Sequence, residues 1–389
     1  MRKIKLFNKL SAKGLDILKK ENFSIDENEE NPDIILLRSH KLHDHKFNDN
    51  LIAIGRAGAG TNNIPIDTCT EKGVVVFNTP GANANAVKEL VLAGLLLASR
   101  NIFEGMRFID KLNSNGDENI SSEIESKKSL FKGTEISGKK LGIIGLGAIG
   151  VNVANDAIRL GLDVYGYDPY ISIDRAWGLS SLVNQADNLG KMLSEVDFLS
   201  IHVPLTEGTK NFLNKEKMNK LKKDIIVLNF ARPEVINEDD LYSCLLNKKI
   251  KKFVTDFPNN KLMELPNVIG LPHLGASTVE AEDNCSIMIA KEILDFINNG
   301  NIIHSVNFPN CTLERTSPYR ITVYHQNKPN MLGKISSILA EENMNITEMM
   351  NKSKNEMAYT IIDINTEPSK ILLNTIKEID GVKFIRSFK

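Results

Sequence analysis

Lys140-Leu-Gly-Ile-Ile-Gly-Leu-Gly-Ala-Ile-Gly150 is the stretch that decides the fold, because an apolar strand leads directly into three glycines and a helix-like segment. In such a loop Gly145 permits a tight turn, Gly147 lets the backbone approach a pyrophosphate, and Gly150 lets the helix pack close to the strand. The N–H groups and dipole at the start of the helix then face the anion. This order of elements predicts a dinucleotide-binding site.

A carboxylate follows where such a site requires one. The second apolar strand, Leu162-Asp-Val-Tyr-Gly-Tyr, is followed by Asp168, close to the usual offset of about 20 residues after the glycines. A carboxylate there accepts hydrogen bonds from the adenosine ribose and repels a 2′-phosphate, which favours NAD over NADP. The alternative is a plain strand-to-helix turn with an acid at a strand end.

Length and composition narrow the class of protein. The 389 residues suit two or three domains, and a net charge of −1 without a basic block argues against nucleic-acid or membrane partners. We therefore expect a small-molecule ligand. The four cysteines lack metal-ligand spacing, so no metal site is expected, and free thiols indicate a reducing compartment. With no signal peptide or membrane span evident, the expected location is the cytoplasm.

Apolar runs predict two doubly wound parallel sheets. Residues 33–37, 51–54 and 74–77 are short apolar runs typical of buried parallel strands, and a second alternation of strands and helices begins at Leu141. The segment 111–132 is charged and weakly periodic, which predicts a solvent-exposed excursion.

Two long helices are also expected. Residues 83–100 are apolar on nearly every side, and Ser277 with Glu280 has the spacing of a capping box that opens a helix ending at Asn299-Gly300.

From Tyr319 the pattern changes to a small ferredoxin-like βαββαβ domain. Pro309 and Pro318 mark the preceding segment, 308–318, as a linker. The predicted elements are a strand at 320–325, a helix at 330–342, strands at 345–351 and 357–364, a helix at 369–378 and a strand at 382–388.

Two side chains that follow strands of the second sheet are candidates for the chemistry. His273 and Arg232 both come after strands, and the carboxyl ends of strands in an open α/β sheet face the ligand crevice. A histidine can exchange a proton near neutral pH, and an arginine fork can hold a carboxylate through two parallel bonds. The structural alternatives are that His273 forms only hydrogen bonds within a turn and that Arg232 is an ordinary surface charge.

Two further segments resemble anion sites. Ile54-Gly-Arg-Ala-Gly-Ala-Gly-Thr-Asn-Asn63 is a glycine-rich turn whose N–H groups and Arg56 could hold a phosphate or carboxylate. Asn78 to Asn85, with Lys88, is polar and precedes the long apolar helix. Each also fits an ordinary turn or helix entry.

Together, the dinucleotide loop with Asp168, Val227-Leu-Asn-Phe-Ala-Arg232 and Pro272-His-Leu-Gly-Ala-Ser-Thr278 resemble the D-isomer-specific 2-hydroxyacid dehydrogenases. Gly55 to Gly60, Ser305 to Pro309 and the C-terminal module narrow the resemblance to members that carry an ACT domain. It implies a discontinuous substrate-binding domain (1–95 and 281–307), an NAD-binding Rossmann domain (96–280), the 308–318 linker and an ACT regulatory domain (319–389).

The resemblance implies NAD-dependent oxidation of the C2 hydroxyl of 3-phospho-D-glycerate, a phosphorylated 2-hydroxy acid, as the first step of L-serine synthesis. Arg232 would hold the carboxylate and His273 would be the acid/base, in a homodimer or homotetramer. The alternatives are a reductase of another 2-oxoacid, such as hydroxypyruvate or glyoxylate, and a non-enzymatic NAD-sensing co-repressor. Implied cofactor residues are Thr79, Gly145, Gly147, Ala148, Ile149, Gly150, Asp168, Val203, Phe230, Ala231, Asp256 and Gly275, and implied substrate residues are Arg56, Ala57 and Gly58.

One position departs from the family pattern. A glutamate in an Asp-Val-Phe-x-x-Glu-Pro segment usually orients the catalytic histidine, but here alignment on Phe257 places Asn260 at that position. An asparagine can orient the ring but cannot stabilise imidazolium by charge. Our hypothesis is that Asp256 or Glu264 substitutes.

The C-terminal module resembles an ACT domain through Val323 to Leu332 and Met344-Asn-Ile346. The resemblance implies an amino-acid effector, L-serine, with His325, Asn327 and Asn345 at the positions that hold it, although Asn330 replaces a common glycine. A dimerisation domain without a ligand is the alternative.

Overall fold

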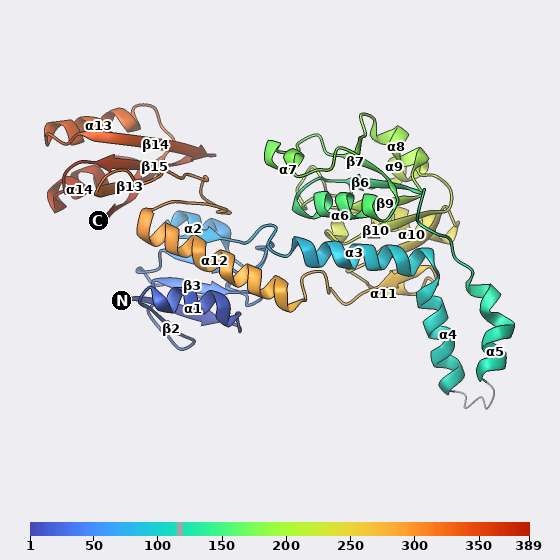
Figure 1. Ribbon diagram of the computed structural model, residues 1–389. Coiled ribbons are helices and arrows are strands. Elements are labelled where there is room, and N and C mark those ends of the chain that lie inside the picture. Colours follow the sequence, from blue (N-terminus) through green and yellow to red (C-terminus); the bar gives the residue numbers. More distant parts are fainter. Residues whose placement is uncertain (115–119) are drawn as a thin grey trace. The chain divides into compact units, whose positions relative to one another are not determined.

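The computed structural model describes residues 1–114 and 120–389, which form two compact units (Figure 1). Unit 1 comprises Met1–Ala82 and Glu282–Lys389, and unit 2 comprises Asn83–Ala281. The chain therefore leaves the first unit and later returns to it, as a discontinuous domain requires.

Unit 1 contains a five-stranded parallel sheet in the order β2-β1-β3-β4-β5. The fully buried Ile34–Leu37 run lies at its centre, with apolar clusters on both faces. Sequence analysis missed β1, whose lysines alternate with buried Ile4 and Leu6. The elements are β1 (Arg2–Phe7), α1 (Ala12–Lys20), β2 (Phe23–Asp26), β3 (Ile34–Leu37), β4 (Ala53–Arg56), α2 (Ile66–Glu71) and β5 (Val75–Phe77).

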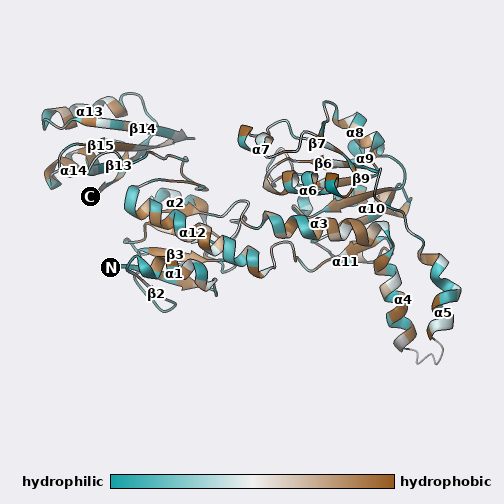
Figure 2. Ribbon diagram, viewed as in Figure 1, coloured by the Kyte–Doolittle hydropathy of each residue, from teal (hydrophilic) through white to brown (hydrophobic). Residues whose placement is uncertain are grey.

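Unit 2 is built on a seven-stranded parallel sheet in the order β12-β11-β10-β9-β6-β7-β8, which confirms the predicted doubly wound architecture. Its central strands are buried and predominantly hydrophobic (Figure 2). The strands are β6 (Lys140–Ile144), β7 (Asp163–Tyr167), β8 (Asn184–Gln185), β9 (Phe198–Ile201), β10 (Ile225–Asn229), β11 (Ile250–Thr255) and β12 (Val268–Gly270). The main helices are α3 (Ala84–Ser99), α6 (Ala148–Arg159), α7 (Ile173–Trp177), α8 (Leu189–Glu195), α9 (Lys215–Lys220), α10 (Glu238–Leu246) and α11 (Asn260–Met263), with a short 3-10 helix η2 (Pro233–Val235).

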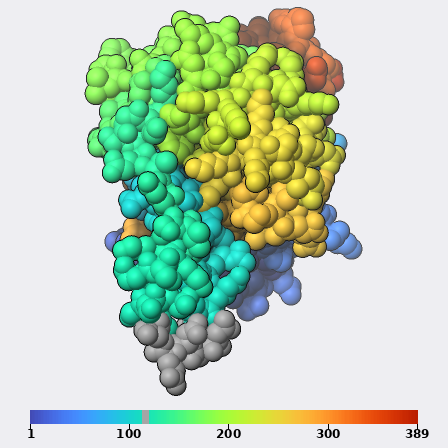
Figure 3. Space-filling view, turned by 90° about the vertical axis from the view of Figure 1, so that its right-hand side faces the viewer, coloured from blue at the N-terminus to red at the C-terminus, as the bar shows by residue number. Residues whose placement is uncertain are grey.

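The predicted excursion at 111–132 is largely helical where it is described. Helices α4 (Ile102–Ser114) and α5 (Ile120–Lys127) and the 3-10 turn η1 (Lys128–Phe131) account for it, and residues 115–119 lie outside the described part. The two helices project together from the sheet (Figures 1 and 3). Local ion pairs such as Lys127 with Glu123 support helix where the apolar periodicity is weak.

Helix α12 (Val279–Asn299) has the predicted extent, and Gly300 follows it with a φ of +69°. The cap differs by one residue from the prediction, because Thr278 Oγ1 rather than Ser277 accepts the amide hydrogen bond, from Ala281 at 3.1 Å. The helix end thus follows the usual capping chemistry.

The C-terminal part of unit 1 has the predicted βαββαβ order and an antiparallel sheet in the order β14-β15-β13-β16. Phe308 stacks on Tyr324 with ring centroids 4.1 Å apart, so this sheet shares the core of the first one. Its elements are β13 (Tyr319–Gln326), α13 (Met331–Glu341), β14 (Ile346–Lys354), β15 (Met357–Ile364), α14 (Lys370–Lys377) and β16 (Val382–Phe388).

Candidate active site

The candidate residues of unit 2 lie along one edge of its sheet. Strand pairing places the last residues of six neighbouring strands in a single row: Tyr167, Ile144, Ile201, Asn229, Thr255 and Gly270. The glycine-rich loop, Asp168, Val203, the segment Phe230–Arg232, Asp256 and the segment His273–Gly275 directly follow these strand ends. Ligands of open α/β sheets bind outside this carboxyl edge, so the topology gathers these candidates on one side.

The glycine-rich loop has space for a phosphate at one position only. A Cβ on Gly150 would lie 2.0 Å from the Gly145 carbonyl oxygen, and Gly145 itself has a φ of +91°. A Cβ on Gly147, by contrast, would meet no atom within 4 Å. Gly147 precedes the first residue of α6, Ala148, where helical N–H groups have no partner within the helix. The residues therefore fit a pyrophosphate bound beside Ala148 and Ile149.

Asp168 holds the same loop from the next strand. Its Oδ2 accepts the Leu146 amide at 2.8 Å, and its Oδ1 accepts the Tyr170 amide at 2.9 Å. The half-buried carboxylate is thus fixed beside the glycines, where a ribose could approach it. This position agrees with the predicted preference for NAD.

The turn that carries Arg232 is fixed by Asn229, a residue that sequence analysis did not single out. The Asn229 side chain is buried, donates to the Arg232 carbonyl at 2.9 Å and accepts the Ala231 amide at 3.1 Å. Arg232 itself is exposed, and its Nη1 donates to the Ala231 carbonyl. A rigid turn therefore presents the Arg232 guanidinium to solvent. The sequence signal that could have identified Asn229 was an amide side chain at the end of a buried strand.

His273 occupies a left-handed turn and keeps its ring accessible. Its φ is +55°, a region that histidine enters more often than most side chains, and its amide donates to the Leu271 carbonyl at 3.0 Å. The ring lies edge-on to Phe257, with centroids 5.0 Å apart. No hydrogen bond or ion pair reaches the ring from the described residues, so both nitrogens are available to a ligand.

Asp256 positions the backbone beside His273 rather than the ring. It is 2% exposed, and its two oxygens accept the Leu274 and Gly275 amides, each at 2.7 Å. The hypothesis that Asp256 replaces the family's glutamate on the ring is therefore wrong in this structure. Asn260 and Glu264 are exposed, at the start and the end of α11, and neither bonds the ring.

The substrate candidates lie in unit 1, at the end of β4. Arg56 is the last strand residue, Ala57 is buried, and Gly58 has a φ of +152°. The Arg56 guanidinium covers Gly58 so closely that a Cβ there would lie 2.4 Å from Nη1. Thr79, the one predicted cofactor residue in unit 1, is fully buried and its amide donates to the Gly58 carbonyl at 3.2 Å.

Lys88 has a structural partner. Its amino group lies 2.7 Å from Asp156 Oδ2 and is largely buried, so it joins α3 to α6. This ion pair lowers the pKa of Asp156 below its usual value, chiefly through the Lys88 hydrogen bond. The observation favours the structural interpretation of Lys88 over anion binding.

The predicted effector residues lie in different parts of the C-terminal sheet. His325 is 2% exposed, with Nε2 2.8 Å from Thr360 Oγ1 and Nδ1 2.8 Å from the Gln326 carbonyl, and burial lowers its pKa. Asn327 follows β13, and Asn345 precedes β14. Because β13 and β14 both run antiparallel to β15 and are in register with it, the two asparagines lie at opposite ends of the sheet.

Comparison with known proteins agrees with this geometry. Residues 92–275 match the family model "D-isomer specific 2-hydroxyacid dehydrogenase, NAD binding domain". The chain is 34% identical over 343 residues to D-3-phosphoglycerate dehydrogenase of Haemophilus influenzae (85% of this chain, 80% of the relative). It is 30% identical over 346 residues to the Escherichia coli K12 enzyme of that name (86% and 80%).

A solved structure supports the same assignment. NAD+-bound 3-phosphoglycerate dehydrogenase of Entamoeba histolytica superposes with a TM-score of 0.63 at 27% identity, covering 79% of this chain and 98% of that one. The predicted family is thereby confirmed: this chain belongs to the D-3-phosphoglycerate dehydrogenases, within the D-isomer-specific 2-hydroxyacid dehydrogenase family.

Proposed function

We propose that this protein oxidises the C2 hydroxyl of 3-phospho-D-glycerate with NAD, giving 3-phosphohydroxypyruvate for L-serine synthesis. The observation that carries the proposal is the carboxyl edge of the unit 2 sheet, where an open glycine loop, an exposed guanidinium and an accessible imidazole follow the alternate strands β6, β10 and β12. The relatives that share most of this chain bear the corresponding name.

Each group has one task in the reaction. Gly147 and the first amides of α6 hold the cofactor pyrophosphate, Asp168 holds the ribose, and bound NAD supplies the hydride acceptor. Arg232 binds the substrate carboxylate through two parallel bonds and so sets the position of C2. His273 takes the C2 hydroxyl proton as the hydride leaves, and returns it in reverse.

The end of β4 in unit 1 carries a further group suited to an anion. Arg56 ends β4, with Ala57 and Gly58 after it, and a guanidinium held over a glycine backbone suits a phosphate or carboxylate oxygen. A phosphorylated substrate gives Arg56 a role that glyoxylate or hydroxypyruvate does not. This charge favours the phosphorylated substrate over the reductase alternative.

Spectrophotometry tests the proposal. NADH formation is expected with 3-phosphoglycerate, and much less with glycerate or 2-hydroxyglutarate. Faster NADH consumption with hydroxypyruvate or glyoxylate than with phosphohydroxypyruvate would support the reductase instead. NAD binding without turnover of any of these compounds would point to the co-repressor alternative.

For the C-terminal domain we propose an ACT-type serine site shared by two copies of the chain. The length of β13, eight residues, separates Asn327 from Asn345 by roughly 25 Å within one copy, too far for one amino acid. Calorimetry is expected to show about one serine bound for each pair of Asn327 and Asn345 at the interface between two copies. Serine is also expected to inhibit NADH formation. Absence of both heat and inhibition would leave a dimerisation domain.

We propose a second homodimer contact in α4. Ile102, Met106 and Ile109 repeat at helical spacing on one face and are 41%, 60% and 40% exposed. Light scattering is expected to give at least twice the 43.3 kDa mass of the chain.

Among the described residues no helix is long and apolar enough to span a bilayer. The proposed location is the cytoplasm, and the four buried free cysteines accord with its reducing conditions.

A further inference from the structure

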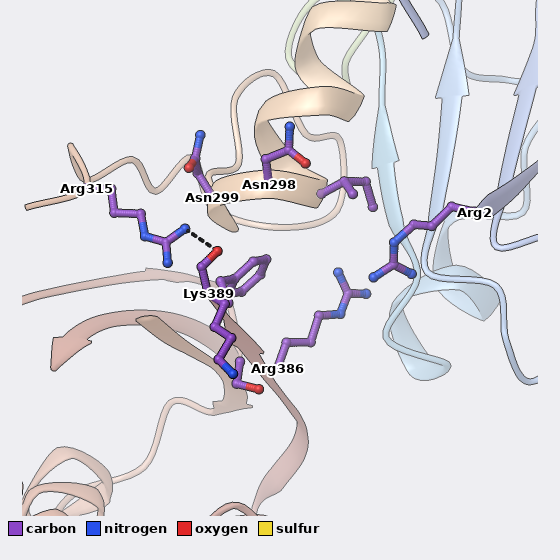
Figure 4. Close-up of a pocket in the computed structure, with 9 residues that line it drawn as sticks. Arg2, Asn298, Asn299, Arg315, Arg386 and Lys389 are labelled. Carbon is purple, nitrogen blue, oxygen red and sulfur yellow. Dashed lines mark hydrogen bonds between the residues drawn. The ribbon is translucent and has the colours of Figure 1, made fainter. Parts of the chain in front are cut away.

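Unit 1 contains a second cationic site, made of residues that none of the candidate sites above includes. A cavity of about 530 Å³ lies between β1, the end of α12 and β16, and four cationic side chains line it: Arg2, Arg315, Arg386 and Lys389 (Figure 4). They come from the first strand, the linker, the last strand and the residue that follows it. Only the tertiary fold brings them together.

Arg386 is the central group, and it lacks an anionic partner. Its guanidinium lies over the rings of Phe296 and Phe384, at 4.6 and 5.2 Å from their centroids. Within the described part of the chain, no hydrogen bond or ion pair reaches it. Burial lowers its pKa to about 10; Tyr359 opposes this lowering, and the positive charge of Arg2 adds to it. The rings of Phe296 and Phe384 therefore hold the charged Arg386 guanidinium in place, and no carboxylate of the described residues pairs with it.

The neighbouring cations are partly compensated. Lys389 Nζ pairs with Glu367 Oε1 at 2.6 Å, in an exposed ion pair. Arg2 faces Arg386 across the cavity, and its closest carboxylate oxygen, on Asp33, is 3.7 Å away in a solvent-exposed pair (Figure 4). Arg315 donates to the carbonyls of Ser317 and Pro318 and to the main-chain oxygen of Lys389, and these bonds fix its orientation. Like charges gathered in this way repel one another unless an anion lies between them.

The helix end at the cavity does not oppose an anion. The C-terminal carbonyls of α12 carry partial negative charge, but Arg320 Nη1 donates to the Asn299 carbonyl at 3.0 Å. Arg320 is itself neutralised by the buried carboxylate of Asp363, its Nη2 lying 2.8 Å from Oδ2. The floor of the cavity is thus polar and satisfied, while its walls are cationic.

We propose that this cavity binds a small multivalent oxyanion, a phosphate ester or a polycarboxylate, between the guanidinium groups of Arg2 and Arg386. Planar guanidinium forks match phosphate and carboxylate oxygens in pairs, which gives such a ligand both affinity and orientation. Because Arg2 belongs to the first sheet and Arg386 to the C-terminal sheet, the bound anion ties these two parts of unit 1 together. The inference does not depend on the proposed catalytic activity.

Calorimetry at low ionic strength tests the site on the full-length protein, with citrate and inorganic phosphate as probes. Saturable binding is expected, weakened at least about tenfold by Arg386→Gln and by Arg2→Gln. Arg386→Lys, which keeps the charge, is expected to lose less. Arg175→Gln, on exposed α7 of unit 2, removes the same charge elsewhere and is expected to bind as the parent does.

Circular dichroism and the KM for 3-phosphoglycerate separate this site from misfolding and from the catalytic site. Folded Arg2→Gln and Arg386→Gln variants are expected to keep the parent KM while losing citrate affinity. Stronger binding of citrate would identify a polycarboxylate site, and stronger binding of phosphate a phosphate site. Absence of saturable binding by the parent, or equal affinity in all variants, overturns the proposal.

Discussion

The two parallel sheets each have a glycine-rich turn after a buried strand, yet the turns are built for different ligands. In unit 2 the helix α6 begins at Ala148, inside the loop that follows β6. In unit 1, β4 ends at Arg56, and α2 begins only at Ile66. Only the first turn has helical N–H groups next to its glycines.

The two turns also differ in the space beside their glycines. Gly147 is open, whereas the Arg56 guanidinium covers Gly58. The first arrangement suits a pyrophosphate held by backbone and helix dipole, and the second suits a smaller anion held by a side-chain charge. Similar glycine spacing therefore does not define the ligand, because the element that follows the loop decides it.

The largest effect expected from a single change is at His273, since the proposed mechanism assigns proton transfer to this side chain of unit 2. His273→Gln should lower kcat by about 10²- to 10⁴-fold while leaving NAD affinity within about threefold. Steady-state NADH formation and a fluorescence titration with NAD measure the two quantities. Unchanged kcat would remove the imidazole from the mechanism.

Two glycine variants separate the turns directly. Gly147→Ala should weaken NAD binding about tenfold, because its methyl group occupies the space left for the pyrophosphate. Gly58→Ala should raise the KM for 3-phosphoglycerate instead, since the added Cβ displaces Arg56. Each variant is the control for the other, and the comparison fails if both change the same constant.

Changes to residues whose hydrogen bonds hold the loops in place are expected to have intermediate effects on kinetics and stability. Asp256→Asn replaces one acceptor by a donor facing an amide, at a cost of about 1–3 kcal/mol in unfolding free energy, with a loss of kcat as the His273 loop shifts. Asn78→Ala is the counterpart in unit 1, where Asn78 Nδ2 donates to the Ala59 carbonyl at 2.6 Å, and it should affect KM more than kcat. Thermal unfolding and steady-state kinetics measure both variants, and an Asp256→Asn protein with parent stability and kcat would contradict the positioning role.

Lys88→Met should have the smallest effect, because the Lys88 ion pair joins two helices of unit 2 and is not part of either glycine-rich turn. The pKa of Asp156 is lowered in the folded state, so its stabilisation is present above the unfolded value near 3.8 and is lost as pH falls through the lowered one. The variant should lose about 1 kcal/mol at pH 7, and the difference should shrink in acid. Urea unfolding at both pH values tests this, with Lys88→Arg as the matched control. A large rise in substrate KM with unchanged stability would instead assign Lys88 to the substrate.

Local patterns were sufficient for much of the fold. The apolar runs of β3, β4 and β5, the glycines of the dinucleotide loop and the last two strands of the C-terminal sheet follow from spacing over a few residues. Strand β1 escaped prediction because its lysines interrupt the apolar run, and burial of Ile4 and Leu6 arises only once β2 and β3 flank it.

The sequence by itself determined which chemical groups this protein has for NAD and an acidic substrate, because each motif sets its own backbone geometry over a few residues. The tertiary structure alone decided what each group faces. It turned Asp256 to the amides beside His273, paired Lys88 with Asp156, and placed Arg2 opposite Arg386. Such contacts join residues far apart in the chain, and their partners are set by the packing of strands and helices rather than by local spacing.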